Sequence, residues 1–358
     1  MDIEKIRNEI RKKFWGALLL KFLSFIYYFL FITKKKGHDI GLLKVNKYSK
    51  PVICVGNISS GGTGKTTFVI SISKKLSNIG IRHTIVLRGY KSESKYNDII
   101  DLNDTNFDRL MLDPAISDES KLIALSLKGL GVPVISSKNR KKSIEFAIHN
   151  YNPQLIIMDD GFQNFSIKKD LSIVIINLNM IEDFLLPFGN LRESYNGIKR
   201  ADFIILNHCE LFEKDFIKKS VEKISKYSNK KIIEAFYKPW GFLDLIKNEK
   251  IILSKFKWKE VAIFSGIGDN SQFKKLLEKY GFIISKSWQF SDHHKYSIQE
   301  LESINKIRES LPLITTLKDA VKFYSRAKEI FREKIYALDV DIVIDDTTVI
   351  SKIQEISK

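Results

Sequence analysis

The feature that most constrains this chain is a glycine-rich segment that follows a short apolar run near its amino end. Residues 51–67 read PVICVGNISSGGTGKTT. An apolar strand, a glycine turn and a helix start would point successive backbone N–H groups at one spot, where the helix N-terminus adds partial positive charge. In such a loop Lys65 reaches the β- and γ-phosphates and the Thr66 hydroxyl holds Mg²⁺. The predicted nucleoside triphosphate site consists of Ser59, Ser60, Gly61, Gly62, Thr63, Gly64, Lys65, Thr66 and Thr67.

This phosphate loop is a variant of the usual pattern. The pattern G-x-x-x-x-G-K-[ST] has glycine where this chain has Ser59, and Gly61 with Gly62 supplies the flexible turn instead. A glycine-rich turn without a ligand is the alternative. The strand–loop–helix context that the motif requires favours a nucleotide site.

Composition bounds the remaining possibilities. A length of 358 residues indicates two domains, or one large α/β domain with an appendage, and 44% hydrophobic residues suffice for a substantial core. The formal net charge of +17 indicates an anionic partner, which could be nucleic acid, a membrane surface or a phosphorylated substrate. The two cysteines, Cys54 and Cys209, lie on or near apolar runs and are typical of reduced core thiols in a cytoplasmic protein.

The amino end carries an apolar segment long enough to span a bilayer. Residues 14–33 include one charge, Lys21, and eight aromatic side chains, and basic triplets lie at residues 11–13 and 34–36. Because both flanks are basic, the positive-inside rule assigns no orientation. A helix lying in the membrane interface explains the flanks and the aromatic residues together, while a spanning helix and a buried core helix remain alternatives.

The rest of the chain alternates apolar strand-like runs with helix-like stretches, which predicts a mostly parallel sheet covered on both faces. A second block, with the same alternation, follows a junction at residues 236–250. The predicted domains are therefore a membrane-associating helix (1–36), a phosphate-loop domain (37–236) and a smaller α/β domain (237–358). The predicted strands are 52–55, 84–87, 132–135, 155–158, 172–176, 203–206, 261–264, 283–287, 313–316 and 335–344, and the helices of the second block are 270–280 and 298–310.

Several polar groups follow these strands, where ligands of parallel sheets bind. Asp159 and Asp160 end an apolar run, and a strand-terminal Asp downstream of a phosphate loop is a candidate Mg²⁺ ligand. If the strand geometry persists, the two carboxylates point to opposite sides and have different roles. Taken alone, the remaining candidates are weaker and read more simply as caps, turns or loops. They are LRGY (87–90), SDE (117–119), LLPFGNLRE (185–193) and SDHH (291–294).

Together these segments resemble the tetraacyldisaccharide 4′-kinases of lipid A biosynthesis. The resemblance rests on VGNISSGGTGKT, LRGYK, SDES, DDGFQN, LLPFGNLRE with KRAD, FSGIGDN, SDHHKYS and TTLKD, and extends from about Pro51 to Asp319. It implies a kinase that passes the γ-phosphate of ATP, with Mg²⁺, to the 4′-hydroxyl of a tetraacyl glucosamine disaccharide 1-phosphate to give lipid IVA. It also implies a place on the cytoplasmic face of the inner membrane of a Gram-negative bacterium, with the amino-terminal helix as the membrane-associating segment and no nucleic-acid partner.

The resemblance also assigns roles to individual residues. Asp118 takes the place of the catalytic aspartate, and His293 takes that of its histidine partner, so that together they form the base, one from each predicted domain. Metal and phosphate chemistry falls to Asp159, Asp160, Gln163 and Glu193, with Thr66, Asp160, Gln163 and Glu193 as the metal set, and Tyr90 is the nucleotide-site tyrosine. Three positions depart from the family pattern: Asn164 stands for His, Leu317 stands for Pro, and Ser117 with Ser120 replaces Gly and Pro.

Two other classes of protein remain as alternatives. The GGTGKTT string resembles the deviant phosphate loops of membrane-associated partitioning and division ATPases, but those have a signature Lys where this chain has Ser60, and they lack the second block. A nucleic-acid-binding protein is suggested by the charge alone, without any recognised binding motif.

Overall fold

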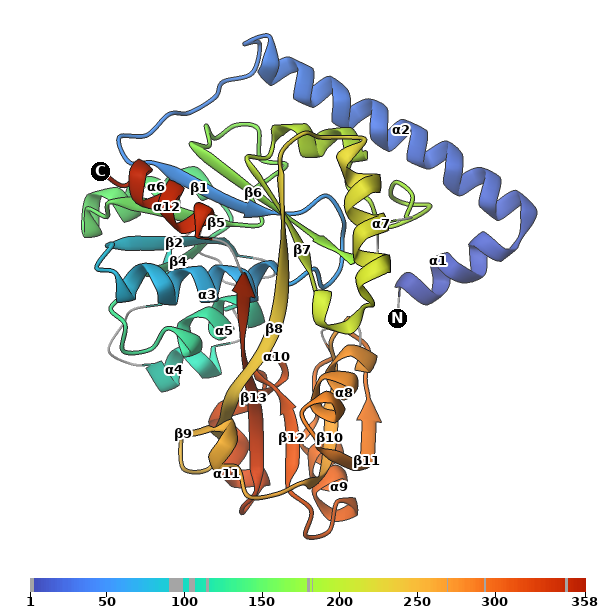
Figure 1. The fold of residues 1–358 in the computed structure, drawn as a ribbon, viewed down its shortest axis with the longest axis vertical. Coiled ribbons are helices and arrows are strands. Elements are labelled where there is room, and N and C mark those ends of the chain that lie inside the picture. Colours follow the sequence, from blue (N-terminus) through green and yellow to red (C-terminus); the bar gives the residue numbers. More distant parts are fainter. Residues whose placement is uncertain are drawn as a thin grey trace. The chain divides into compact units, whose positions relative to one another are not determined.

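The computed structural model describes residues 3–89, 99–102, 107–113, 116–178, 181, 183–268, 270–292, 294–344 and 347–358. The chain forms two compact units (Figure 1). Unit 1 comprises residues 1–86, 140–236 and 344–358, and unit 2 comprises residues 87–139 and 237–343. The predicted domains were continuous ranges, whereas the units interleave along the chain. Residues 87–139 belong with the second block, and residues 344–358 belong with the phosphate-loop unit.

Unit 1 is built on a parallel sheet with the order β7-β6-β1-β5-β2. Every residue of its three central strands is buried, as expected for a parallel sheet covered on both faces. The predicted mostly parallel α/β fold is therefore confirmed. Cys54 and Cys209 are buried free thiols, as the sequence indicates. The strands are β1 (Val52–Gly56), β2 (His83–Arg88), β5 (Leu155–Asp159), β6 (Leu171–Asn177) and β7 (Phe203–Asn207).

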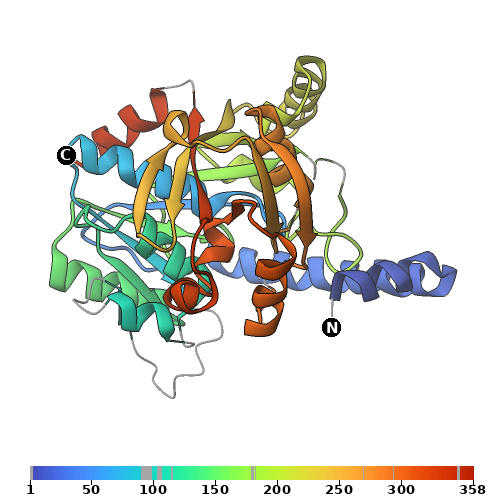
Figure 2. The same cartoon turned by 90° about the horizontal axis from the view of Figure 1, so that it is seen from below.

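Helices connect these strands and extend the unit at both chain ends. Helix α3 follows β1 and α7 follows β7, the connection that parallel neighbours use, whereas β5 and β6 are joined by a loop without a helix. Figures 1 and 2 show the two amino-terminal helices, in blue, running along the outside of unit 1. The helices of unit 1 are α1 (Ile3–Lys12), α2 (Phe14–Asp39), α3 (Lys65–Asn78), α6 (Arg140–Tyr151), the 3₁₀ segments Tyr195–Arg200 and Cys209–Leu211, α7 (Lys214–Ser225) and α12 (Thr348–Ile356).

Helix α2 packs on unit 1 through a narrow stripe and leaves the rest of its apolar surface exposed. Leu20 and Ser24 are buried, whereas Phe22, Phe25 and Phe29 are 60%, 68% and 63% exposed. By length and composition α2 could cross a membrane, but only 6% of its most apolar stretch is buried. The alternative of a buried core helix is therefore wrong.

Strand β8 (Lys231–Asp244) carries the chain from unit 1 into unit 2 without a break in the strand. Its first residues pair with β7, and its last residues pair with β9 (Glu249–Ile252). Pro239 lies between these two ladders, so its missing N–H costs no ladder hydrogen bond in either of them. The predicted junction is therefore a strand segment rather than a flexible linker.

The strand order continues through β8 into unit 2 as β8-β13-β12-β10-β11, in which the β10–β11, β10–β12 and β12–β13 pairs are parallel, while β3 and β4 form an antiparallel pair that follows β2 in the order. Aromatic rings of Phe242, Phe256, Phe282 and Tyr336 pack together in the core of unit 2. The strands are β3 (Ile100–Asp101), β4 (Val134–Ser137), β10 (Glu260–Ser265), β11 (Ile283–Gln289), β12 (Leu313–Thr316) and β13 (Ile335–Ile344). The helices are α4 (Phe107–Leu112), α5 (Asp118–Ser126), α8 (Asn270–Lys279), α9 (Ile298–Ile307), α10 (Leu317–Ala320) and α11 (Ala327–Ile330), with 3₁₀ turns at Leu253–Lys255 and Tyr324–Arg326.

We expect Gly241→Ala to destabilise the fold. A Cβ at Gly241 would lie 2.1 Å from the carbonyl oxygen of Ile251 on β9, which is backbone and cannot rotate away. Relief requires the β8–β9 ladder to shift, which costs about 1–3 kcal/mol. Urea unfolding measures the loss. Lys238→Ala on the exposed face of the same strand is the control and should change stability by less than about 0.5 kcal/mol. Equal stability of both variants would contradict the close approach.

Candidate active site

The phosphate loop connects the end of β1 to the start of α3. Gly61 and Gly64 adopt φ values of 98° and 83°, which favour glycine because other residues are strained there. Gly64 is the N-cap of α3 and has no side chain to cap the helix. The first N–H groups of α3 are thus available to an anion, and the positive end of the helix dipole points to the same place.

Asparagines at the ends of neighbouring strands brace this loop. Asn207, the last residue of β7, donates to the Thr63 carbonyl at 2.9 Å, and Asn57 donates to the Thr63 hydroxyl at 2.7 Å. Asn177, the last residue of β6, lies 3.4 Å from the Gly62 carbonyl. Sequence reasoning missed all three asparagines, although an apolar run that ends in Asn was the available signal.

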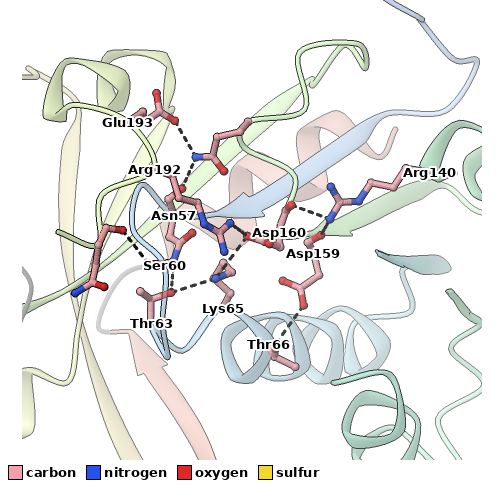
Figure 3. A network of polar contacts seen from close by, with 12 residues as sticks. Asn57, Ser60, Thr63, Lys65, Thr66, Arg140, Asp159, Asp160, Arg192 and Glu193 are labelled. Atoms are coloured by element: carbon pink, nitrogen blue, oxygen red, sulfur yellow. Dashed lines mark hydrogen bonds and ion pairs between the residues drawn. The ribbon is translucent and has the colours of Figure 1, made fainter. Parts of the chain in front are cut away.

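Asp159 closes β5 and lies beside the first turn of α3. The Thr66 hydroxyl donates to Asp159 Oδ2 at 3.2 Å (Figure 3). The other carboxylate oxygen, Oδ1, is buried and accepts no hydrogen bond from the described part of the chain. Burial raises the pKa of Asp159 to about 6, although Lys65 acts in the opposite direction. Within the described residues this carboxylate is therefore held at only one of its two oxygens.

Asp160 faces two cations. Arg192 donates to Asp160 Oδ1 at 2.7 Å, and the Lys65 ammonium lies 3.5 Å from the same oxygen (Figure 3). Burial alone would raise the pKa of Asp160, but Lys65, Arg192 and Arg140 together lower it below its usual value. The carboxylate is thus ionised and pairs with both cations.

The two carboxylates diverge because the backbone turns between them. Asp160 has a φ of 50°, so it lies outside the strand geometry from which the sequence argument started. Arg140, at the start of α6, donates to the carbonyl oxygens of Asp159 and Asp160 at 2.7 Å each and holds this turn. Like the three asparagines, Arg140 was not identified by the sequence analysis.

Gln163 and Glu193 form a separate cluster with Arg200. Glu193 is 1% exposed and accepts from Gln163 at 2.8 Å and from Arg200 at 2.7 Å. Gln163 also donates to the Asn57 carbonyl at 2.6 Å, which ties the cluster to the phosphate loop. The predicted metal set is therefore divided: Gln163 and Glu193 lie together, while Thr66 pairs with Asp159 and Asp160 pairs with Lys65 and Arg192.

The loop of residues 183–193, which we call the bridging loop, lies against the phosphate loop. Ser60 donates to the Asn190 carbonyl through its N–H at 2.7 Å and through its hydroxyl at 3.0 Å. The Arg192 N–H donates to the Ile58 carbonyl at 2.7 Å, and Ser59 pairs with Leu191 in an antiparallel bridge. The predicted site residues Ser59 and Ser60 thus hold a neighbouring loop in addition to shaping their own.

Comparison with known proteins decides the family. A family model described as tetraacyldisaccharide-1-P 4′-kinase matches residues 16–358. The chain belongs to this family. A tetraacyldisaccharide 4′-kinase of Elusimicrobium minutum is 32% identical over 351 residues, which cover 96% of this chain and 92% of the relative. That of Aquifex aeolicus is 32% identical over 90% of this chain and 93% of the relative.

A solved structure of the same family agrees with the fold. The "apo" form of LpxK from Aquifex aeolicus in complex with ATP has 30% identity and a TM-score of 0.75, covering 94% of this chain and 98% of that one. The resemblance stated from the sequence motifs and the phosphate-loop α/β architecture are both confirmed.

Other predicted residues of this kinase family member belong to unit 2 or lie outside the described residues. Asp118 is the first residue of α5, where the Ser117 hydroxyl accepts from the Ser120 N–H at 3.2 Å. Asp118 and Asp292 both belong to unit 2. The sequence analysis had placed Asp118 and the SDHH segment (291–294) in different domains, which differs from this division. Tyr90 and His293 lie outside the described residues.

Asn164, the departure from the family's histidine, has a local role. Its side-chain oxygen accepts from the Ser166 N–H at 3.2 Å and from the Ser166 hydroxyl at 2.8 Å. This is a side-chain turn of the kind that Asn favours, and it needs no titratable group.

We expect Asp159→Asn to change stability in a pH-dependent way. The pKa of Asp159 is raised from its ordinary value of 3.8 to about 6, so ionisation of the native state opposes folding. At pH values between these two pKa values, the free energy of unfolding of the natural chain falls by about 1.4 kcal/mol per pH unit as pH rises. The variant has no carboxyl at this position, so its free energy of unfolding does not show this decrease. The variant should therefore gain about 1 kcal/mol relative to the natural chain between pH 5 and pH 8, as measured by urea unfolding.

Asp160→Asn is the matched control. Against the effect of burial, Lys65 and Arg192 hold the Asp160 pKa below its usual value, so its carboxylate is ionised in both states above pH 5. This variant should lose stability by a similar amount at pH 5 and pH 8. The raised pKa of Asp159 would be contradicted if the stability of Asp159→Asn, relative to the natural chain, were lower at pH 8 than at pH 5.

Proposed function

We propose that this chain is an ATP-dependent kinase that phosphorylates the 4′-hydroxyl of a tetraacyl glucosamine disaccharide 1-phosphate, giving lipid IVA. A bond forms between the acceptor oxygen and the γ-phosphorus, and the bond from that phosphorus to the β–γ bridging oxygen breaks. The acceptor proton passes to a general base, and ADP leaves. The observation that carries the proposal is the convergence of Lys65 and Arg192 beside the phosphate loop, in a chain of this family.

These residues suit phosphoryl transfer because its transition state spreads negative charge over the transferred oxygens. Lys65 opens α3 and Arg192 comes from the bridging loop, so two cations reach the phosphate position from different elements. The N-terminus of α3 adds backbone donors. Positioned cations of this kind lower the barrier without reorganisation during the reaction.

The residues present fit a magnesium ion. Asp159 offers a buried oxygen without a partner among the described residues, and the Thr66 hydroxyl lies beside the same carboxylate. We propose that these two hold the ion, with Gln163 and Glu193 of the predicted set close to the phosphate loop. When bound, the ion would neutralise charge on the β- and γ-phosphates. No three His, Cys, Asp or Glu side chains gather as a metal site within the described ranges, which fits an ion held partly by the nucleotide.

The general base is assigned by resemblance. Asp118, with His293 as its partner, is proposed to accept the proton of the acceptor hydroxyl. Ordinary helix capping also explains Ser117 and the first turn of α5, so the role of Asp118 rests on its match to the family motif. Tyr90 keeps its proposed role at the nucleotide on the same ground.

We propose that α2 lies in the cytoplasmic surface of the inner membrane. Its exposed face is apolar, its ends are basic, and the lipid acceptor resides in a bilayer. The opposite stripe packs on unit 1 at Leu20 and Ser24, near the middle of the helix. One face of α2 is thus occupied by protein along part of its length, which supports the interfacial arrangement over a span.

The alternative of a partitioning or division ATPase has less support. Family membership covers residues 16–358, including the second block that such ATPases lack. The basic charge is explained by an anionic lipid and membrane surface without nucleic acid.

We expect Lys65→Met to abolish transfer of ³²P from γ-labelled ATP to tetraacyldisaccharide 1-phosphate in mixed micelles. The lysine charge is worth more in the transition state than in the ground state, so kcat should fall at least a hundredfold, or about 2.7 kcal/mol. Lys74→Met, on the same helix, is the control and should retain activity. Label that never enters the lipid, together with ATP hydrolysis stimulated by DNA, would overturn the proposed kinase. A Lys65→Met variant within tenfold of the natural chain would overturn the role of Lys65.

We expect the double variant Phe22→Glu, Phe29→Glu to lose binding to vesicles that contain anionic phospholipid. Each phenylalanine is more than half exposed on α2, and its burial in lipid contributes about 1.5–3 kcal/mol. Vesicle affinity should fall at least tenfold in flotation assays. Ile283→Glu, on β11, is a control of equal exposure at 63%. Unchanged flotation of the α2 variant would show that another surface contacts the membrane.

A further inference from the structure

The bridging loop lies between helix α2 and the phosphate loop and is hydrogen-bonded to both. On the helix side, the Ser24 hydroxyl accepts from the Phe188 N–H at 3.0 Å and shares its own hydrogen between the Leu20 carbonyl of α2 at 2.9 Å and the Leu185 carbonyl at 3.1 Å. The Tyr27 hydroxyl donates to the Arg192 carbonyl at 2.8 Å. From α1, Arg7 donates to the Gly189 carbonyl at 3.0 Å. The helix therefore contacts the backbone of the loop at both of its ends.

The main chain of Arg192 connects these contacts to the site. Its N–H donates a hydrogen bond to the Ile58 carbonyl beside the phosphate loop, and its carbonyl accepts one from the Tyr27 hydroxyl of α2. Its side chain donates a hydrogen bond to the Asp160 carboxylate. A shift of the Tyr27 hydroxyl would therefore move the Arg192 carbonyl, which belongs to the same residue as the guanidinium and as the N–H that contacts the phosphate loop. At a reacting centre, displacements of about 1 Å cost large factors in rate.

The bridging loop is internally braced, so it transmits such a shift. The Leu186 N–H donates to the Leu191 carbonyl, and the Leu191 N–H donates to the Phe184 carbonyl, both at 2.8 Å. Gly189 is packed so closely that a Cβ would lie 2.3 Å from the Phe184 carbonyl. The loop has little room to absorb movement locally.

We propose that α2 is a part of the reaction site as well as a membrane contact, and that Tyr27 and Ser24 are positioning residues for Arg192. The inference rests on the proposed kinase function and deepens it. Leu20, Ser24, Tyr27 and Phe31 repeat at intervals of three and four residues, which places them on one face of the helix. The exposed phenylalanines form the opposite surface, so the two roles belong to different residues and can be separated by substitution.

Tyr27→Phe tests the proposal because it removes only the hydroxyl that holds the Arg192 carbonyl. Tyr28→Phe is the matched control: the same change, one residue along the same helix, at a hydroxyl without a hydrogen bond to any described residue. Both variants should bind anionic vesicles and ATP like the natural chain. On lipid acceptor in mixed micelles, Tyr27→Phe should lower kcat about five- to tenfold with KM for ATP little changed, and Tyr28→Phe should leave kcat within twofold. Equal activity of the two variants, or a loss that follows vesicle binding, would overturn the proposal.

A double-mutant cycle shows whether Tyr27 acts through Arg192. Arg192→Ala removes the guanidinium, so adding Tyr27→Phe to it should cause less than a twofold further loss. A full, multiplicative loss would show that Tyr27 acts by a different route and would overturn the assignment.

Hydrogen exchange measures the same coupling without an acceptor. Amide exchange of residues 183–193, followed by mass spectrometry, should be faster in Tyr27→Phe than in Tyr28→Phe, because the Arg192 peptide loses one of its two anchors. Unchanged exchange would overturn the inference. This measurement remains valid if the natural chain transfers no phosphate to lipid, an outcome that would contradict the proposed function alone.

Discussion

Two neighbouring carboxylates at the buried end of β5 set the electrostatics of the site. One of them, Asp160, is ionised because Lys65 and Arg192 lie against it. The other, Asp159, forms no carboxylate ion pair among the described residues, and burial raises its pKa. An incoming triphosphate would give Lys65 and Arg192 a second anionic partner, and the ion that accompanies it would supply the charge that Asp159 lacks. The bound ligand would thus offset charges that the chain leaves without full compensation: the two cations at Asp160 and the buried carboxylate of Asp159. A binding site favours a particular charge pattern in this way.

Much of the fold follows from local sequence, and the reason is physical. Buried parallel strands need continuous apolar runs, and the runs at residues 52–55, 155–158 and 203–206 all lie within observed strands. The phosphate loop was predictable because its glycines and its Lys65 act within a few residues of one another. The domain boundaries were less predictable. Apolar periodicity does not show that residues 87–139 pack with residues from the later half of the chain.

The parts of the site that sequence reasoning missed depend on distant contacts. Arg140 binds carbonyl oxygens nearly twenty residues away, and Asn207 binds a carbonyl more than a hundred residues earlier. An arginine at position 140 or an asparagine at position 207 does not by itself indicate a partner so far away in the sequence. Strand alternation predicted that the Asp159 and Asp160 side chains point to opposite sides, but their divergence arises from the positive φ of Asp160. Motif matching placed Asp118 where composition favoured only a helix cap, and its role stays a prediction.

Because the two units interleave along the chain, the order of synthesis determines when each unit can complete its core. Helix α2 leaves the ribosome before any strand of unit 1, and α12, whose Val349 and Ile353 are buried in that unit, leaves after all of them. The unit cannot complete its core until residues 344–358 are available, and unit 2 must be built in between. During that interval the apolar surface of α2 is already present, and a nascent chain with exposed apolar surface seeks either a partner or a lipid phase. Unit 1 therefore closes its core with the last residues to be made, and the apolar face of α2 is exposed throughout that interval.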